Sequence, residues 1–261
     1  MIKVKEIAET IEKFAPLSLQ EGYDNAGLQV GDPDMPVSAC LLCLDVTEDV
    51  MAEAKARQCN LIVSHHPLLF KGLKHVTGAD QTQRIVIDAI RNNIAIYSAH
   101  TNLDSVWNGV SHEIAEMIGI SNTEVLDPQA GNPRAGLGVI GDITPTPTLE
   151  FLRNLKETFN VKALRYAAQV PKLVVRRVAV CGGSGASFIG LALRKGADAF
   201  VSGDFKYHDF TTYAPEIILA DIGHYESELC SRRIFSRIIR ETYPDIVVYF
   251  SEADKNPIKY M

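Results

Sequence analysis

Apolar residues recur along the first part of the chain in two different patterns. Residues 3–14 place Val, Ile, Ala and Phe at intervals of three and four, which predicts an amphipathic helix. An apolar stripe of the same kind returns at 81–91, and Thr47 is a plausible N-cap for a further helix at 48–57. Between these segments, residues 39–44 and 61–63 are almost wholly apolar, which predicts short strands that are covered on both faces of a sheet. Alternation of strands and helices in this order indicates an α/β fold with a parallel sheet.

The second half of the chain repeats this pattern 138 positions later. Residues 197–202 match residues 59–64, and the apolar run that ends at Cys181 matches the run that ends at Cys43. Short apolar strands also resemble one another by chance, which leaves coincidence open as the alternative. Because two successive strands keep one spacing, we interpret the pattern as an internal duplication of an αβ unit. The sequence therefore predicts two similar αβ lobes.

A stretch rich in Pro, Gly, Asn and Thr separates the two repeats at residues 127–147. Such a composition is typical of a loop or linker. We therefore expect a first lobe of residues 1–126 and 221–261, which carries two adjacent histidines and the last helix. We expect residues 127–220 to form the second lobe, with a functional cleft between the two lobes.

Metal-binding residue types follow the predicted strands at the points where the strands end. His65 and His66 come directly after the strand at 61–63, and Pro67 disfavours a helix there. Alone, this pair fits two partly solvated loop histidines as well as it fits metal ligands. The other strand ends carry, in chain order, His100 and Asp104, Asp204 and His208, and His224 and Glu228. Because sites in parallel α/β sheets form at the carboxyl ends of strands, we interpret these residues as parts of one site.

His224 and Glu228 lie four residues apart at the start of the last predicted helix, on the same side as the apolar Phe235. The carboxylate of Glu228 therefore points inward, and a metal ion is one of the few partners that can compensate a buried carboxylate. Imidazoles and carboxylates without thiolate suit Zn, Mn, Fe, Co or Ni. The candidate ligands of these types outnumber those that one catalytic zinc with an open position takes, whereas two divalent ions that share a bridging carboxylate use all of them.

A glycine-rich loop, Gly182-Gly183-Ser184-Gly185, follows a predicted strand and precedes a helical segment at 188–195. Backbone amides in such a loop can bind a phosphate group of a substrate or cofactor. The loop has neither the Rossmann spacing nor the lysine of a P-loop. A tight strand-to-helix turn without a ligand is the alternative interpretation.

Composition narrows the classes of function. Lys and Arg number 26 against 32 Asp and Glu, so the net charge of -6 gives no general attraction to nucleic acid or to an anionic membrane. The five cysteines are odd in number and lie in apolar surroundings, which is typical of reduced core cysteines. No apolar run approaches the roughly 20 residues of a membrane span, and the first residues lack the apolar core of a signal peptide. We therefore expect a cytoplasmic enzyme or binding protein.

The motifs resemble those of the GTP cyclohydrolase 1 type 2 family, also called the NIF-three-like dinuclear metal-centre proteins. The resemblance covers nearly the whole chain. It rests on Asp24–Leu28, Ser64–Pro67, His100–Asp104, Cys181–Gly185, Gly203-Asp204 with Tyr207-His208, and Gly223-His224 with Ser227-Glu228. Some members of that family carry an extra domain between the lobes. Residues 127–134 leave no room for one, so this chain resembles the compact form.

The resemblance implies two divalent metal ions and a set of ligands for them. These ligands would be His65, His66, Asp104, His224 and Glu228. Glu228 would bridge both ions, and His100 would lie close by as a candidate catalytic residue. The resemblance also implies a ring-shaped homohexamer.

Two classes of function follow. The first is a metal-dependent hydrolase that acts on a purine nucleotide or a related phosphorylated metabolite, with ring opening of GTP as the family's named example and a metal-bridging hydroxide as nucleophile. The second is a non-catalytic metal-binding, metal-trafficking or adaptor protein. Asp204 and His208 favour the enzyme, because neither is needed as a ligand and both suit proton transfer. In this interpretation His208 gives a proton to the leaving group and Asp204 orients it.

Overall fold

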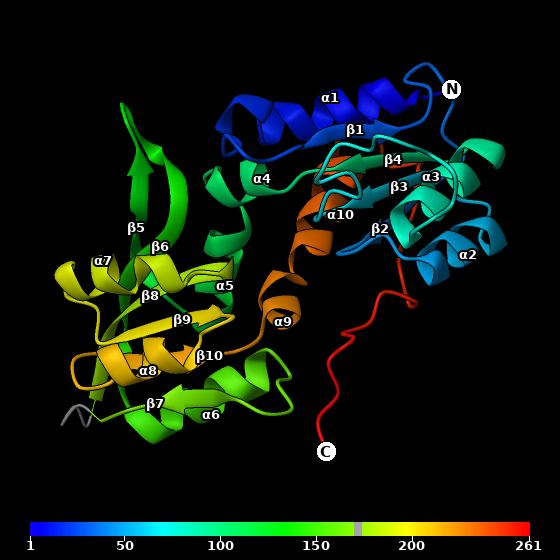
Figure 1. The fold of residues 1–261 in the computed structure, drawn as a ribbon. Coiled ribbons are helices and arrows are strands. Elements are labelled where there is room, and N and C mark those ends of the chain that lie inside the picture. The colour runs from blue at the N-terminus through cyan, green and yellow to red at the C-terminus, as the bar shows by residue number, and fades with distance from the viewer. Residues whose placement is uncertain (170–173) are drawn as a thin grey trace. The chain divides into compact units, whose positions relative to one another are not determined.

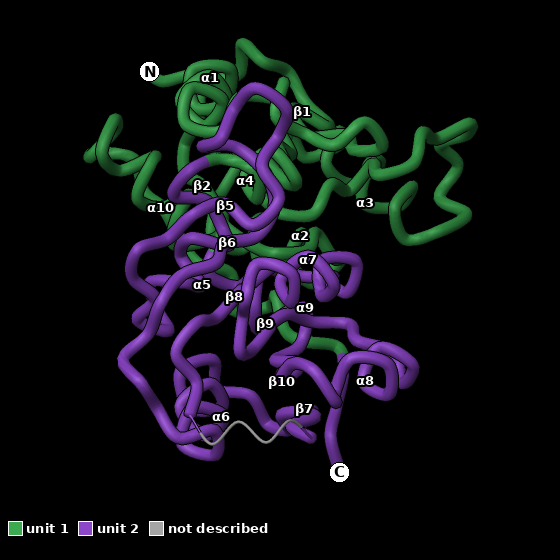
Figure 2. Tube along the Cα trace, turned by 90° about the vertical axis from the view of Figure 1, so that its left-hand side faces the viewer, with its two compact units in different colours: residues 1–106, 231–257 green, residues 107–230, 258–261 purple. Residues whose placement is uncertain are grey.

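The computed structural model describes residues 1–169 and 174–261. They form a mixed α/β structure with two sheets (Figure 1), as the alternation of strand and helix patterns predicted. The chain divides into two compact units (Figure 2). Unit 1 comprises residues 1–106 and 231–257, and unit 2 comprises residues 107–230 and 258–261.

The unit boundaries differ from those of the lobes that we expected. Residues 107–126 and 221–230 belong to unit 2, although we expected them in the first lobe. Packing explains this difference, because helices α5 (Val110–Ile118) and α9 (His224–Glu228) both pack against strand β8 (Val174–Ser184).

Unit 1 is built on a five-stranded sheet with the strand order β1-β4-β3-β2-β11. Its strands are β1 (Gly27–Val30), β2 (Ala39–Cys43), β3 (Leu61–Ser64), β4 (Ala95–Ser98) and β11 (Val247–Phe250). All neighbours are parallel except β1, which pairs antiparallel with β4. Every residue of β2 and β3 is buried, as their unbroken apolar sequences predicted.

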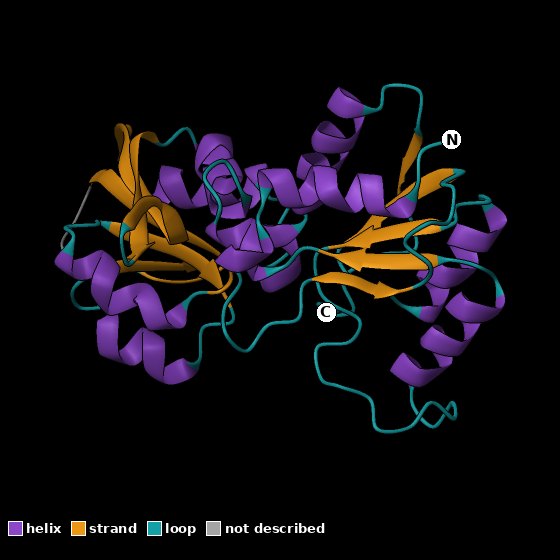
Figure 3. Cartoon of the chain, turned by 90° about the horizontal axis from the view of Figure 1, so that it is seen from above, coloured by secondary structure: helices purple, strands orange, loops and turns teal. Residues whose placement is uncertain are grey.

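Helices cover both faces of this sheet (Figure 3). On one face, α2 (Glu48–Ala56) and α3 (Gln81–Arg91) contribute their apolar stripes to a shared core. On the other face, α1 (Val4–Phe14) packs against α10 (Ser231–Thr242), which contacts β2. The first three helices begin and end within one residue of the segments predicted from the sequence. Two short helices, η1 (Leu17–Leu19) and α4 (Thr101–Ser105), complete unit 1.

Unit 2 is built on a six-stranded sheet with the strand order β5-β6-β8-β9-β10-β7. Its other strands are β5 (Ser121–Gln129), β6 (Asn132–Pro147), β7 (Arg165–Ala167), β9 (Ala199–Gly203) and β10 (Ile218–Asp221). Strands β8, β9 and β10 are parallel, and the remaining pairs are antiparallel. Its other helices are α6 (Thr148–Thr158), η2 (Ala186–Phe188), α7 (Ile189–Arg194) and α8 (Tyr207–Tyr213). Within the described ranges, the chain has no helix of the length and apolar character that a membrane crossing requires.

The stretch at 127–147, which we expected to separate two lobes, forms part of this sheet. It belongs to the antiparallel hairpin of β5 and β6, inside unit 2. Gly136 shows why a glycine-rich segment can pair here. Its φ is +143°, and a Cβ at this position would collide with the carbonyl oxygen of Asp127 on the opposite strand. Glycine therefore permits a close approach of the strands, a role that composition alone does not reveal.

The strand register of the two sheets follows the repeat seen in the sequence. Cys40 pairs with Leu61 between β2 and β3, and Val178 pairs with Ala199 between β8 and β9. Both members of the second pair lie 138 positions after their counterparts. In each unit an antiparallel edge strand also flanks the parallel core, β1 beside β4 and β7 beside β10, and in unit 2 the antiparallel β6 flanks its other side, beside β8. These correspondences are what an internal duplication of an αβ unit predicts.

Candidate metal centre

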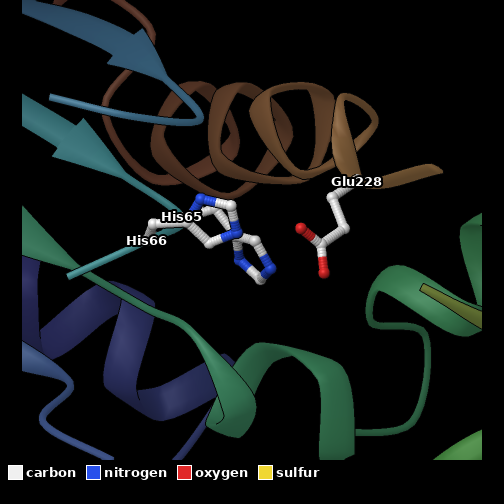
Figure 4. Close-up of side chains that lie close together, drawn as sticks. All are labelled: His65, His66 and Glu228. Carbon is white, nitrogen blue, oxygen red and sulfur yellow. The ribbon is translucent and has the colours of Figure 1, made fainter. Parts of the chain in front are cut away.

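His65 and His66 directly follow β3, and their backbone N–H groups continue its pairing with β2 by donating to Cys43 and Leu44. Figure 4 shows both rings at the end of this strand. The fully buried His65 ring bonds through Nδ1 to the carbonyl oxygen of Ala99, at 2.9 Å. A carbonyl oxygen only accepts hydrogen bonds, so Nδ1 carries the proton and Nε2 carries the lone pair that a metal ion needs.

His66 and His100 have their Nδ1 atoms bonded to carboxylates. His66 Nδ1 lies 2.8 Å from Asp45 Oδ1, and His100 Nδ1 lies 2.8 Å from Asp24 Oδ1. An ionised carboxylate also only accepts, so these rings too have Nε2 as the ligand atom. Each of the two carboxylates therefore fixes the tautomer of its histidine.

Asp24 is itself held in place by Thr101, whose backbone N–H and hydroxyl both donate to Asp24 Oδ2. Burial raises the pKa of Asp24, but the hydrogen bonds from His100 and Thr101 outweigh burial, so its pKa lies well below the ordinary value. The charged form of Asp24 is thus the form that the fold stabilises.

These side chains gather into one cluster in unit 1. The ring centroids of His65, His66 and His100 lie 5.2 to 5.5 Å apart. Asp104, in α4, brings its Oδ1 to 3.5 Å from His65 Nε2. The structure therefore collects three imidazoles and one carboxylate, all of them residues that the sequence indicated.

His224 and Glu228 form a second cluster, in unit 2. Both lie in α9, where Glu228 is buried (Figure 4) and its Oε2 lies 2.9 Å from His224 Nε2. The other nitrogen, His224 Nδ1, lies 2.7 Å from Asp204 Oδ2. Because the imidazole has a carboxylate at both nitrogens, a proton or a metal ion between His224 Nε2 and Glu228 would stabilise the close approach of the two groups. This donor set fits a divalent cation.

The glycine-rich loop lies directly beside Glu228. Gly183 has φ +60°, and a Cβ there would collide with Glu228 Oε1. Its N–H donates to Ser227 Oγ at 2.9 Å, and the Gly182 N–H donates to Ser111 Oγ at 3.4 Å. The Gly182 and Gly183 N–H groups are thus engaged with side chains, and Gly183 makes room for a carboxylate. The phosphate contact expected from Gly182, Gly183, Ser184 and Gly185 stays a prediction.

Asp204 and His208 are arranged differently from our expectation. Asp204 has φ +59° and lies just after β9, before the N-cap of α8 at Lys206. It therefore lies outside the helix that carries His208, and its carboxylate contacts His224. His208 is exposed, with its ring against Tyr207. Asp204 thus contacts a histidine of the second cluster, whereas we expected it to orient His208. The catalytic roles of Asp204 and His208 stay predictions.

The sequence interpretation did not assign Asp24 or Asp45 to the site. Asp45 comes directly after the apolar run at 39–44, so it has the same strand-end position as His65 and His66. That position was the available signal. Asp24 does not follow a predicted strand. It reaches His100 from a turn 76 positions earlier in the chain.

Comparisons with known proteins support the resemblance seen in the motifs. The family model described as Duf34/NIF3 (NGG1p interacting factor 3) matches residues 2–257. A protein of Clostridium perfringens named GTP cyclohydrolase 1 type 2 homolog is 36% identical over 263 residues, which span 100% of both chains. A hypothetical protein of Staphylococcus aureus has a solved structure with a TM-score of 0.90, 26% identity and 99% coverage of each chain.

A further solved structure, that of reduced HcgD from Methanocaldococcus jannaschii, has a TM-score of 0.81 and 30% identity. It covers 96% of this chain and 98% of its own. The family model and the full-length identity lead to one conclusion: this chain belongs to the Duf34/NIF3 family.

Proposed function

We propose that this chain is a metal-dependent hydrolase that acts on a purine nucleotide or a related phosphorylated metabolite. In this proposal one dinuclear centre holds two divalent ions, of Zn, Mn, Fe, Co or Ni. The ligands are His65, His66, Asp104, His224 and Glu228, with Glu228 as the bridge. The set contains the His and Glu combination that is suited to hold a metal ion.

One observation carries the proposal. All four histidines of the two clusters bond through Nδ1 to an acceptor, which is one backbone carbonyl oxygen or one of three aspartates. Such partners fix ring orientation and raise the basicity of the ligand nitrogen, and they commonly accompany metal-binding histidines. A set of merely solvated loop histidines has no need of four such partners.

Two bound divalent ions would supply Lewis acidity and a water molecule of lowered pKa, so that no Ser or Cys nucleophile is required. The chain's own residues then have separate tasks. Asp24, Asp45 and Asp204 orient the imidazoles. His100 lies beside the ligands and binds or positions the substrate. His208 gives a proton to the leaving group, for which a histidine is suited near neutral pH.

The substrate class is supported by likeness. The curated relative that is 36% identical along the whole chain is named GTP cyclohydrolase 1 type 2 homolog. A non-catalytic metal-binding or trafficking protein is the second candidate, because the hydrogen bonds described above prepare ligand atoms and would serve metal storage equally well. Stoichiometric metal binding with no turnover is what that candidate predicts.

The deciding experiment measures bound metal and turnover together. We expect the purified protein, loaded with each candidate metal, to hold two ions per chain and to turn over at least one member of a panel of purine nucleotides, pterins and phosphoesters. His65→Ala should lose metal and turnover together, whereas the exposed His75→Ala should keep both ions. Two ions per chain with no turnover of any panel member would overturn the hydrolase proposal and leave the binding protein.

We also propose the ring-shaped homohexamer that the family resemblance implies. Light scattering at micromolar concentration tests it, and a monomer would contradict it.

A further inference from the structure

Two exposed aromatic side chains extend the imidazole cluster of unit 1 to the surface. Tyr23 is 65% exposed and Phe70 is 44% exposed. Their rings meet edge to face with centroids 6.4 Å apart, and the Phe70 ring meets the His100 ring in the same way at 6.1 Å. The series of rings thus runs without a break from the candidate metal ligands to solvent. Large aromatic side chains are usually withdrawn from water, so an exposed pair next to a site calls for an explanation.

The segments that carry the two rings are tied together. Asn25 Nδ2 donates to the carbonyl oxygen of Leu69 at 2.7 Å, and the Leu69 N–H donates to Gln29 Oε1 at 3.2 Å. Gln29 Nε2 in turn donates to the carbonyl oxygen of Asn25, at 2.7 Å. Leu68 and Leu69 also pack against the apolar core of unit 1. Phe70 is therefore presented by an anchored backbone, and the ordering that a ligand would otherwise have to impose is already in place.

The chain that follows Phe70 carries local positive charge. Lys71 and Lys74, both exposed, are the first charged residues after Phe70, and the next acidic residue is Asp80. This segment stands out in a chain whose net charge is -6. It favours an anionic group next to the aromatic pair.

We propose that Tyr23 and Phe70 bind the planar ring of the substrate, and that Lys71 attracts its phosphate. This inference rests on the proposed function, because it assigns the ring-binding part of the same site. Aromatic side chains stack on the faces of planar heteroaromatic rings without reading their hydrogen-bonding edges, which suits a site that selects for flatness. The two rings meet edge to face, so they do not use up both of their faces on each other. The ligand class is a small nucleoside phosphate or a phosphorylated heterocycle of similar shape.

The test compares GMP with ribose 5-phosphate, which has the same phosphate and sugar but no purine base. Calorimetry on the metal-loaded protein should show that wild type binds GMP more tightly. Loss of one stacking aromatic typically weakens binding by roughly 5- to 150-fold. We expect Phe70→Leu and Tyr23→Leu each to lower the affinity for GMP within that range and to leave the affinity for ribose 5-phosphate unchanged.

Matched variants separate stacking from general damage. Phe70→Tyr keeps an aromatic ring and should bind GMP as wild type does. Phe250→Leu and Tyr166→Leu remove aromatic rings of similar exposure elsewhere, 40% and 51%, and should change neither affinity. Lys71→Ala should weaken GMP and ribose 5-phosphate by the same factor.

The outcomes distinguish this inference from the proposed function. Equal or undetectable binding of the two probes by wild type, or leucine variants that bind GMP as wild type does, would overturn the ring-binding assignment. Both results leave metal content and turnover intact and therefore do not touch the hydrolase. Conversely, a protein without turnover that still prefers GMP, and loses this preference in Phe70→Leu, would support the ring site and reject the hydrolase. Circular dichroism tests whether each variant is folded. If Tyr23→Leu does not fold, Phe70→Leu alone decides the test.

Discussion

Asp104 and Glu228 occupy corresponding positions in the two units. Asp104 comes four residues after His100, in the short helix that follows β4, and Glu228 comes four residues after His224, in the short helix that follows β10. In each unit an aspartate from another segment bonds the Nδ1 of the histidine. Each unit thus has a histidine and a carboxylate four residues apart after a strand, with the shorter carboxylate in unit 1 and the longer one in unit 2.

Replacing the longer carboxylate tests whether it is a ligand. Glu228→Gln keeps the shape of the side chain but removes the charge that would bridge two dications, so we expect metal content to fall from two ions per chain to one or none. Elemental analysis after metal loading and gel filtration measures this. Glu241→Gln, an exposed change on α10, should keep both ions. Retention of two ions by Glu228→Gln would exclude Glu228 as the bridge.

A methyl group added at Gly183 should displace the carboxylate of Glu228. Gly183→Ala costs about 1 to 2 kcal/mol for a left-handed backbone conformation and also pushes its Cβ against Glu228 Oε1. We expect a lower free energy of unfolding in urea and a weaker affinity for metal.

The chain offers a matched control for this change at Gly196. Gly196 has φ +78°, and among the described residues other than its chain neighbours none has a heavy atom within 4 Å of the position that a Cβ would take. Gly196→Ala therefore carries the backbone cost without the collision. It should lose stability by a similar backbone amount and keep its metal affinity. If both variants bind metal alike, Gly183 does not position Glu228.

His112 should make the protein less stable in mild acid. Burial, with a smaller contribution from Arg134, lowers the pKa of His112 from 6.5 to about 4. Between these two values the unfolded chain binds more protons than the folded one, so stability is lost as pH falls from 6.5 toward 4. For this half-buried ring we expect a loss of about 1 to 2 kcal/mol between pH 7 and pH 5.

Comparison with His112→Phe isolates this contribution from other titrating groups. Phenylalanine keeps a ring to pack on Trp107, whose centroid lies 4.3 Å from the imidazole, but it does not titrate. Urea unfolding at pH 7 and pH 5 should show a smaller loss in the variant than in wild type. Equal losses in the two proteins would mean that His112 titrates normally in the folded state.

His208→Ala separates proton transfer from metal binding. As the proposed general acid, His208 should contribute roughly 10² to 10⁴ in kcat, and its loss should leave two ions bound. The exposed neighbour Tyr207 gives a matched control, since Tyr207→Ala should retain kcat. A rise in KM with unchanged kcat would instead make His208 a substrate-binding residue.

Much of the fold was accessible from the sequence because the core strands are apolar along their whole length. The segments at 39–44 and 61–63 could only be covered strands, and the helices at 3–14, 48–57 and 81–91 have clear apolar stripes. The metal-binding residue types were equally visible, because each lies in the short segment that follows such a strand. The apolar pattern of a segment predicts its secondary structure well where the segment is fully buried.

What the sequence did not reveal depends on contacts between distant segments. The hairpin of β5 and β6 was not predicted, because a glycine-rich composition is typical of a loop. Here Gly136 instead allows the two strands to approach closely. The pairing of Asp204 with His224 was missed because helical spacing suggested His208 as its partner, whereas a left-handed residue places Asp204 outside that helix. Such partners are set by the ends of strands in three dimensions, and spacing along the chain does not report them.

The sheet of unit 1 takes its last strand from a late part of the chain. Strand β11, at Val247–Phe250, pairs with β2, at Ala39–Cys43, and all of unit 2 up to residue 230 is encoded between them. During synthesis on the ribosome, unit 2 therefore emerges and can fold before β11 is made. Until then, one edge of β2 keeps its backbone N–H and C=O groups without their strand partner. A ribosome that stalls within unit 2 releases a chain with an open sheet edge, which is the form most prone to join another chain.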